Sequence, residues 1–160
     1  MSNALEVIKK SPLFDSCKPE ILEKIAELSK VRELGPGQSL FFENEDAKSF
    51  FLVRSGTISI RKASKEGDVD LAKIGADSNL GEMALLREKG ALYPKRSASA
   101  EASESCILAE IPYVEFEKLL ENDGQLAAQF FKNLAIQLSA RIRRTGQDLS
   151  SLKALRLRHL

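Results

Sequence analysis

The stretch Gly81-Glu82-Met83-Ala84-Leu85-Leu86, followed after a loop by Arg96-Ser97-Ala98-Ser99, decides how this chain is interpreted. A glycine lets the backbone approach a ligand closely, and a short apolar turn directs its free N–H groups at an anion. An arginine offers a planar pair of donors to phosphate oxygens, and the carboxylate of Glu82 can accept a hydrogen bond from a ribose hydroxyl. Together, the two segments carry the groups that a small phosphorylated ribonucleotide needs.

Short apolar stretches separated by turn residues surround this motif between residues 31 and 111. The turns include Gly35-Pro36-Gly37 and Ser55-Gly56, which are typical sites of chain reversal. The candidate strands are residues 39–42, 50–53, 57–61, 69–74, 97–100 and 105–111. Many short strands at this spacing are typical of a sandwich, a roll or a barrel.

Helical patterns flank the strands on both sides. Leu5 and Ile8 predict a short first helix, and Pro19 stands where a second one begins. Pro112 likewise opens a third helix, which Asn122-Asp123-Gly124 ends. We therefore expect two short N-terminal helices and a helical C-terminal region.

A long uninterrupted helix is predicted after Gly124. The residues that recur along it at steps of three and four form a seam: Phe131, Leu134, Leu138, Ile142, Thr145, Leu149 and Leu152. A helix of about 30 residues is about 45 Å long, more than a small domain can cover alone. We expect part of it to cover the strands, and residues near 130–155 to pair two copies of the chain in a homodimer.

These segments resemble the cyclic-nucleotide-binding domain family, in particular its catabolite-activator type. The resemblance begins at Ser11-Pro12-Leu13-Phe14, continues through Phe41-Phe42-Glu43 and residues 51–56, and reaches the long helix. It implies an α+β, mainly β fold, in which a β-roll with jelly-roll topology is flanked by N-terminal helices and by a long C-terminal helix. The implied organisation is one domain over residues 1–160, with helices in 1–30, the β-roll in 31–111 and helices in 112–160.

By this resemblance the motif is a phosphate-binding cassette for a cyclic mononucleotide, with cAMP favoured over cGMP. Arg96 neutralises the cyclic phosphate, Gly81 allows close approach, and Glu82 holds the ribose 2′-hydroxyl. The N–H groups of Met83 and Ala84 face the phosphate. The ordinary alternatives are a surface Arg96 paired with Glu82 or another carboxylate, and a Glu82 that is simply an acid in the first turn of a helix.

Three further residues complete the implied site. Ser97 reaches the phosphate or the base, Arg141 of the long helix supports Glu82, and Thr145 meets the amino edge of adenine. No catalytic residue, no metal and no cofactor is expected beside the nucleotide ligand.

The loop from Arg87 to Lys95 is several residues longer than the family usually has. Tyr93 within it is expected to pack over the base, to cap an empty pocket or to project into solvent. Lys95 replaces a proline that often precedes the arginine, and Asn44 replaces a turn glycine, although asparagine tolerates left-handed geometry. The longer loop leaves open a second hypothesis, a dimerisation or docking module that binds no nucleotide.

The composition is that of an ordinary soluble domain, with 160 residues, 43% of them hydrophobic and 29% charged. No apolar run reaches the roughly 18 residues of a membrane span, and the N-terminus lacks a signal peptide, which predicts a cytoplasmic protein without a membrane partner. Cys17 and Cys106 lack metal-ligand spacing and are expected to be reduced thiols. Residues 124–160 carry a formal charge of +6 and residues 1–123 a charge of −5, which we interpret as a solvated helix face.

We expect neither catalysis nor specific DNA recognition within this chain. His159 is the only histidine, so histidine-based metal sites and catalytic triads lack members. No helix-turn-helix follows before Leu160, so we expect no specific DNA binding within this chain. A third hypothesis is the sensory half of a DNA-binding regulator or of a larger signalling protein. The main hypothesis is a regulatory domain that signals allosterically to an unknown effector protein.

Overall fold

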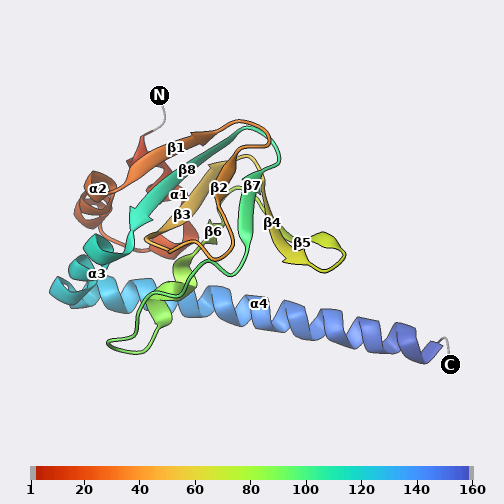
Figure 1. The fold of residues 1–160 in the computed structure, drawn as a ribbon. Coiled ribbons are helices and arrows are strands. Elements are labelled where there is room, and N and C mark those ends of the chain that lie inside the picture. The colour runs from red at the N-terminus through yellow and green to blue at the C-terminus, as the bar shows by residue number, and fades with distance from the viewer. Residues whose placement is uncertain (1–2, 159–160) are drawn as a thin grey trace.

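The structure, a computed structural model, describes residues 3–158, so His159 lies outside it. The helical elements are α1 (Ala4–Lys10), η1 (Pro12–Phe14), α2 (Pro19–Leu28), η2 (Glu82–Leu86), α3 (Tyr113–Asn122) and α4 (Gly124–Arg158). The strands are β1 (Lys30–Leu34), β2 (Ser39–Phe41), β3 (Ser49–Ser55), β4 (Ile58–Ser64), β5 (Gly67–Ile74), β6 (Asn79–Leu80), β7 (Ser99–Ala102) and β8 (Cys106–Pro112). Figure 1 shows the strands gathered in one body from which α4 extends.

Two antiparallel sheets form the β-roll (Figure 1). Their strand orders are β1-β8-β3-β6 and β2-β7-β4-β5. The alternation along β3 divides the core, because Phe51 and Val53 lie between the sheets whereas Phe50 and Leu52 lie beneath the helices. The predicted mainly β fold with flanking helices is confirmed.

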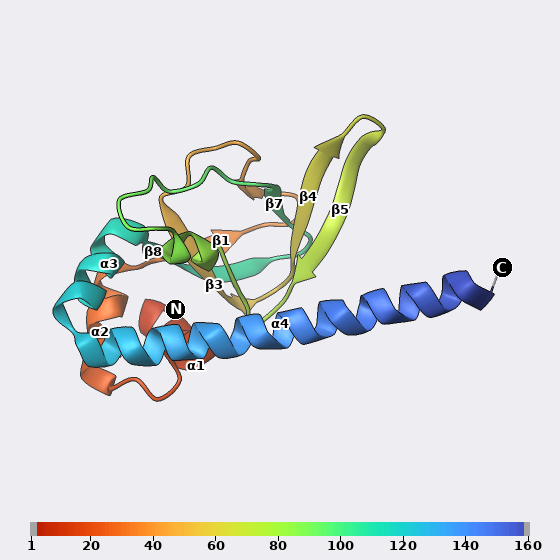
Figure 2. The same cartoon turned by 90° about the horizontal axis from the view of Figure 1, so that it is seen from below.

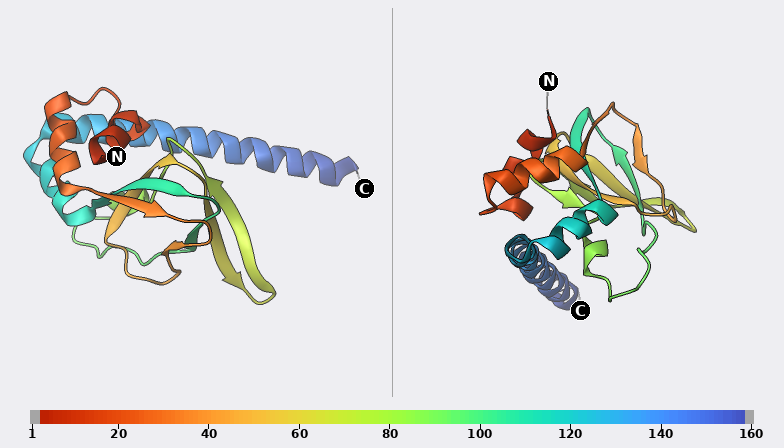
Figure 3. Two further views of the ribbon diagram at one scale, coloured as in Figure 1. Left: turned by 90° about the horizontal axis from the view of Figure 1, so that it is seen from above. Right: turned by 90° about the vertical axis from the view of Figure 1, so that its left-hand side faces the viewer.

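Aromatic side chains join the helices to the first sheet. The rings of Phe116 in α3 and Phe130 in α4 have centroids 5.0 Å apart, and both rings also contact Phe14 and Phe50. Burying each such side chain contributes roughly 1.5–3 kcal/mol to folding. This packing holds the first turns of α4 against the roll, with the shorter helices around them (Figure 3).

Several local features differ from the sequence-based expectation. β7 begins at Ser99 and not at residue 97. The edge strands β1 and β6 were not recognised one by one, because β6 has two residues and only Leu34 of β1 is buried. The β4–β5 hairpin projects from the body (Figure 2), and its apolar residues Val69 and Leu71 are exposed. Asn44 adopts the left-handed conformation with φ 68°, as expected.

Both cysteines are free thiols, as predicted. Cys17 is half-buried and Cys106 is buried. Burial raises the pKa of each thiol, which favours the protonated form.

The long helix α4 has 35 residues and is therefore about 52 Å long. Its first part is fixed by Asn133, whose side-chain amide donates to the carbonyls of Leu13 and Asp15 at 2.9 Å each. From Arg141 onward every described residue of α4 is exposed, and Ile142 of the predicted seam has 72% of its surface open to solvent. Within residues 3–158, no helix combines the length and apolar character needed to cross a membrane.

Candidate functional site

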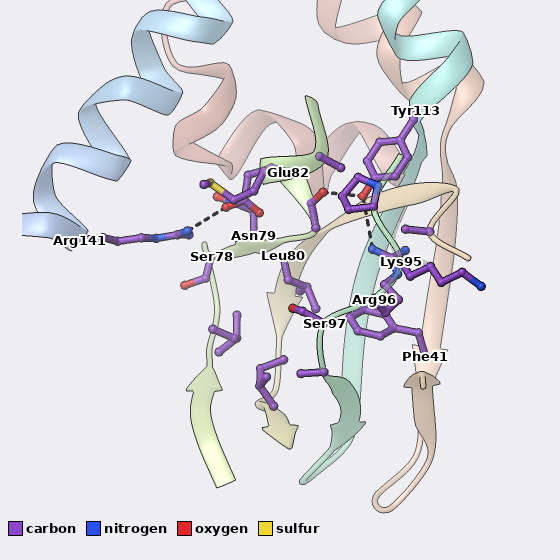
Figure 4. Close-up of a pocket in the computed structure, with 18 of the residues that line it drawn as sticks. Phe41, Ser78, Asn79, Leu80, Glu82, Lys95, Arg96, Ser97, Tyr113 and Arg141 are labelled. Carbon is purple, nitrogen blue, oxygen red and sulfur yellow. Dashed lines mark hydrogen bonds and ion pairs between the residues drawn. The ribbon is translucent and has the colours of Figure 1, made fainter. Parts of the chain in front are cut away.

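A cavity of about 450 Å³ lies between the β-roll and α4 (Figure 4). Its walls come from β4, β5, η2, the segment before β7 and α4. The predicted site residues that line it are Gly81, Glu82, Met83, Ala84, Arg96, Ser97 and Arg141. The fold therefore brings the two halves of the motif and the long helix to one pocket.

Gly81 is a position that only glycine fits. Its φ of +86° lies in the left-handed region, and it immediately precedes η2. A Cβ atom there would lie 2.8 Å from Nη1 of Arg96 and 3.3 Å from the carbonyl oxygen of Ser49. The absent side chain is what lets the turn and the guanidinium approach each other.

Arg96 is buried, with 8% of its surface exposed, so the interpretation as a surface arginine is wrong. Its Nη2 donates to the carbonyl of Ser49 at 2.7 Å, and its Nη1 donates to the hydroxyl of Tyr113 at 3.3 Å. The guanidinium carbon lies 4.3 Å from the centroid of the Phe41 ring. Among the residues that the structure describes, no carboxylate pairs with Arg96, and its Nε has no hydrogen-bond partner. A buried cation with only neutral partners is costly, and an anionic ligand would offset that cost.

Glu82 and Arg141 form the contact that the family resemblance implied. Glu82 is 1% exposed, and its Oε1 accepts from Nη1 of Arg141 at 2.9 Å. Figure 4 shows Arg141 reaching from α4 toward this carboxylate. Glu82 also stands first in η2, so its position in a first helical turn holds as well.

Thr145 does not join the pocket in the single chain. It is exposed on α4, and its hydroxyl donates to the carbonyl of Arg141 at 3.0 Å. Ser97, by contrast, lines the pocket as an exposed residue at its edge.

Sequence reasoning missed several residues that line the pocket. Ile60 and Ile74 give it an apolar wall, and Tyr113 closes it beside Arg96. Lys73 and Arg144 add two positive charges. The excess charge of residues 124–160 was interpreted as a solvated face only, and Arg144 shows that this charge also reaches the pocket.

The loop of residues 87–95 differs from all three expectations for Tyr93. The Tyr93 ring stacks on the Tyr113 ring with centroids 4.8 Å apart, and the guanidinium carbon of Arg87 lies over the Tyr93 ring, 3.9 Å from its centroid. The Tyr93 hydroxyl donates to Oε1 of Glu117 at 2.6 Å, and Arg87 binds the same carboxylate at 2.7 and 3.1 Å. The loop is therefore attached to α3, and Tyr93 lines no part of the pocket.

This attachment changes the ionisation of its members. Burial and the hydrogen bond to Glu117 raise the pKa of Tyr93 to about 12. Burial opposes ionisation of Glu117, but the hydrogen bonds from Arg87 and Tyr93 outweigh it and lower the pKa of that carboxyl. The anchor therefore joins a neutral phenol, a carboxylate and a guanidinium at neutral pH.

The family model described as the cyclic nucleotide-binding domain matches residues 31–123 of this chain. This chain belongs to the cyclic nucleotide-binding domain family. The matched residues include the roll, η2, Arg96 and α3.

Individual relatives agree with that membership. The cyclic AMP receptor protein of Thermus thermophilus is 29% identical over 146 residues, which cover 91% of this chain and 63% of the receptor. The acetyltransferase Pat of Mycolicibacterium smegmatis is 27% identical over 84% of this chain and 40% of its own length. A crystal structure of a cyclic nucleotide-binding domain from Methylobacillus flagellatus superposes with a TM-score of 0.71 and 25% identity, covering 88% of this chain and 77% of that one. The chain thus spans less than two thirds of both curated relatives, and their whole-protein activities do not carry over to it.

Proposed function

We propose that this chain is a sensor domain that binds a cyclic mononucleotide beside Arg96, with cAMP favoured over cGMP. The observation that supports this proposal most directly is the buried guanidinium of Arg96. Within the described part of the chain, all of its hydrogen-bond partners are neutral. A cyclic phosphodiester supplies the missing negative charge, and a charge-assisted hydrogen bond of this kind contributes about 1.5–3 kcal/mol. The Thermus relative, named for its binding of cyclic AMP, supports the choice of ligand.

The pocket offers a place for each part of such a ligand. The turn at Gly81, the first N–H groups of η2 at Met83 and Ala84, and Arg96 surround the phosphate. Glu82 uses one carboxylate oxygen for Arg141 and presents the other to the ribose 2′-hydroxyl. The base lies along the apolar wall at the mouth, where Ser97 stands at the edge. Thr145 of α4 lies outside the pocket in the single chain, so its hydroxyl, which donates to the carbonyl of Arg141, reaches the purine only if α4 moves when the ligand binds.

The hypothesis of a domain without ligand rested on the longer loop. That loop packs against α3 through Glu117, and its inserted tyrosine lies outside the pocket, which the loop reaches only with Pro94 and Lys95 at its end. The pocket is thus left open to a nucleotide, which favours the binding function.

The same proposal includes a homodimer and a signalling step. Ile142, Leu149 and Leu152 are exposed along α4 beyond the roll, and pairing two such helices would cover them. Arg141 joins that helix to Glu82, so ligand binding and helix position are coupled. The recipient is an effector protein of unknown identity, and the expectation that this chain reads no DNA sequence stays a prediction.

Calorimetric titration with cAMP and cGMP tests the binding step. Ligand at about 100 times its dissociation constant should stabilise the fold by about 2.7 kcal/mol. Arg96→Met should abolish binding in a chain that stays folded, whereas Arg143→Met, an exposed cation on α4, should bind as the wild type does. No heat and no thermal shift with either nucleotide at millimolar concentration contradicts the proposed function.

Hydrogen exchange tests the signalling step. Saturation with cAMP should increase the protection of amides between residues 140 and 155, and Thr145→Ala should reduce both this protection and the preference for cAMP. Changes confined to residues 80–100 would leave α4 a passive strut.

A further inference from the structure

The Tyr113 hydroxyl joins the two halves of the phosphate-binding motif. It donates to the carbonyl of Gly81 at 2.5 Å and accepts from Nη1 of Arg96 at 3.3 Å. The side chain is fully buried, so water does not compete for these bonds. One hydroxyl therefore sets the distance between the turn and the guanidinium (Figure 4).

Two aromatic rings stack on the Tyr113 ring. Phe50 is nearly parallel to it at 13°, with centroids 6.2 Å apart, and belongs to the core beneath the helices. Tyr93 lies closer, at 17° and 4.8 Å. Phe50 is fixed by the core, whereas Tyr93 belongs to a loop and needs its own support.

Helix α3 provides that support. Glu117 stands four residues after Tyr113, so both side chains lie on one face of the helix. Tyr93 contacts both of them, because its ring stacks on Tyr113 while its hydroxyl binds Glu117. Arg87 closes the arrangement with two bonds to the same carboxylate.

We propose that Tyr113, Tyr93 and Glu117 are positioning residues that set where Gly81 and Arg96 stand to receive the ligand phosphate. The lengthened loop is then a brace: Glu117 holds Tyr93, Tyr93 holds the ring of Tyr113, and the hydroxyl of Tyr113 holds the cassette. The proposal rests on the proposed nucleotide binding. Since Tyr93 and Glu117 line no part of the pocket, their effect on the ligand is transmitted through Tyr113.

Calorimetry with cAMP measures the effect on affinity. Tyr113→Phe should weaken binding about tenfold, because it removes both hydroxyl bonds and keeps the ring. Tyr93→Leu should weaken cAMP binding several-fold. Tyr93→Phe should weaken it less, because phenylalanine keeps the stacked ring and loses only the hydrogen bond to Glu117. Leu92→Ala is the matched control, since Leu92 lies in the same loop and is 91% exposed. It should bind as the wild type does.

Phosphorothioate analogues separate positioning from a general loss of stability. Replacing one or the other exocyclic phosphate oxygen of cAMP by sulfur gives two diastereomers, and their affinity ratio reports how the phosphate meets Arg96 and the turn. Tyr113→Phe and Tyr93→Leu should change this ratio, and Leu92→Ala should not. A wild-type ratio and wild-type affinity in all variants would overturn the proposal while leaving nucleotide binding intact.

A measurement without ligand keeps the two proposals distinguishable. The chain has two tyrosines, so fluorotyrosine labelling gives two fluorine NMR resonances, assigned with Tyr93→Phe. Glu117→Gln should shift both resonances, and Arg96→Met should shift that of Tyr113. If Glu117→Gln moves the Tyr93 resonance alone, the brace does not reach Tyr113 and the inference fails, whether or not the wild type binds a nucleotide.

Discussion

The carboxylate of Glu82, almost completely buried, is bound at 2.9 Å by the guanidinium of Arg141, which is about half exposed on α4. The two residues are 59 positions apart in the chain, and their contact joins η2 to the helix that leaves the roll. Because the carboxylate is buried, removal of the arginine would leave a buried negative charge without a compensating partner.

Arg141→Ala should therefore destabilise the fold by about 1–3 kcal/mol, as expected when a buried acceptor loses its donor. Arg143→Ala is the matched control, because Arg143 is an exposed residue of the same helix whose guanidinium donates to the hydroxyl of Ser139. Urea unfolding at neutral pH measures both. Glu82→Gln should recover part of the loss in the Arg141→Ala background, and equal stability of the two alanine variants would contradict this account.

Comparison of Gly81→Ala with Gly90→Ala separates the cost of backbone strain from the cost of steric overlap with Arg96. Both glycines have positive φ, but a Cβ at Gly90 meets nothing within 4 Å, whereas a Cβ at Gly81 lies 2.8 Å from Arg96. Gly90→Ala should lose roughly 1 kcal/mol from backbone strain alone. Gly81→Ala should lose clearly more and should also weaken nucleotide binding, as measured by thermal unfolding and calorimetry. Equal losses at the two positions would show that the close approach to Arg96 carries no cost.

The interactions among Arg87, Tyr93 and Glu117 should make the free energy of unfolding depend on pH in a defined way. The lowered pKa of Glu117 adds stability that is present above the ordinary value of 4.5 and is lost as pH falls through the lower folded-state pKa. The raised pKa of Tyr93 adds stability that is present below 10 and is lost as pH rises toward about 12. The stability difference between wild type and Glu117→Gln should thus be constant near neutral pH and should shrink in acid. A difference that persists unchanged at pH values well below 4.5 would refute the assignment.

Lys73 and Arg144 should contribute to affinity through charge alone. Both are exposed at the pocket, so their attraction to an anionic ligand is screened by salt. Lys73→Gln and Arg144→Gln should each weaken cAMP binding a few-fold at low ionic strength, with little effect at high salt. Lys62→Gln, on the hairpin outside the pocket, is the control. A loss that is independent of salt would instead indicate a specific hydrogen bond.

Leu149→Asp should convert the proposed dimer to a monomer. Leu149 is exposed in the single chain, so the aspartate costs the monomer little, while in a helix pair it would be desolvated. Light scattering should report twice 17.7 kDa for the wild type and the single mass for the variant. A wild-type chain that stays monomeric at high micromolar concentration would contradict the dimer.

The β-roll and its helices could be predicted because their signals are local. Pro19 and Pro112 mark helix starts, the turns interrupt the apolar runs, and the motif around Gly81 and Arg96 carries its chemistry in adjacent residues. The contact between Arg141 and Glu82 was predicted only through the family resemblance, since nothing local joins positions so distant.

The remaining site residues depend on how elements meet. Tyr113 reads from sequence as the start of a helix, and only the packing of α3 on β3 shows that its hydroxyl reaches Gly81 and Arg96. Tyr93 was misplaced because a loop has no periodicity, and its position is set by Glu117 on another element. Thr145 was assigned to the base on the resemblance, but the pocket within one chain ends before it.

The geometry of α4 turns a small local displacement into a larger distant one. The helix is fixed at Asn133 by two hydrogen bonds to the N-terminal segment, meets the pocket at Arg141, and continues to Arg158. With a rise of about 1.5 Å per residue, Arg141 is about 12 Å from that pivot and Arg158 about 37 Å. A tilt about Asn133 that moves Arg141 by about 1 Å would therefore carry Arg158 through about 3 Å. Because Arg141 and Arg158 lie on the same side of Asn133, the exposed end of α4 would move about three times as far as the pocket end.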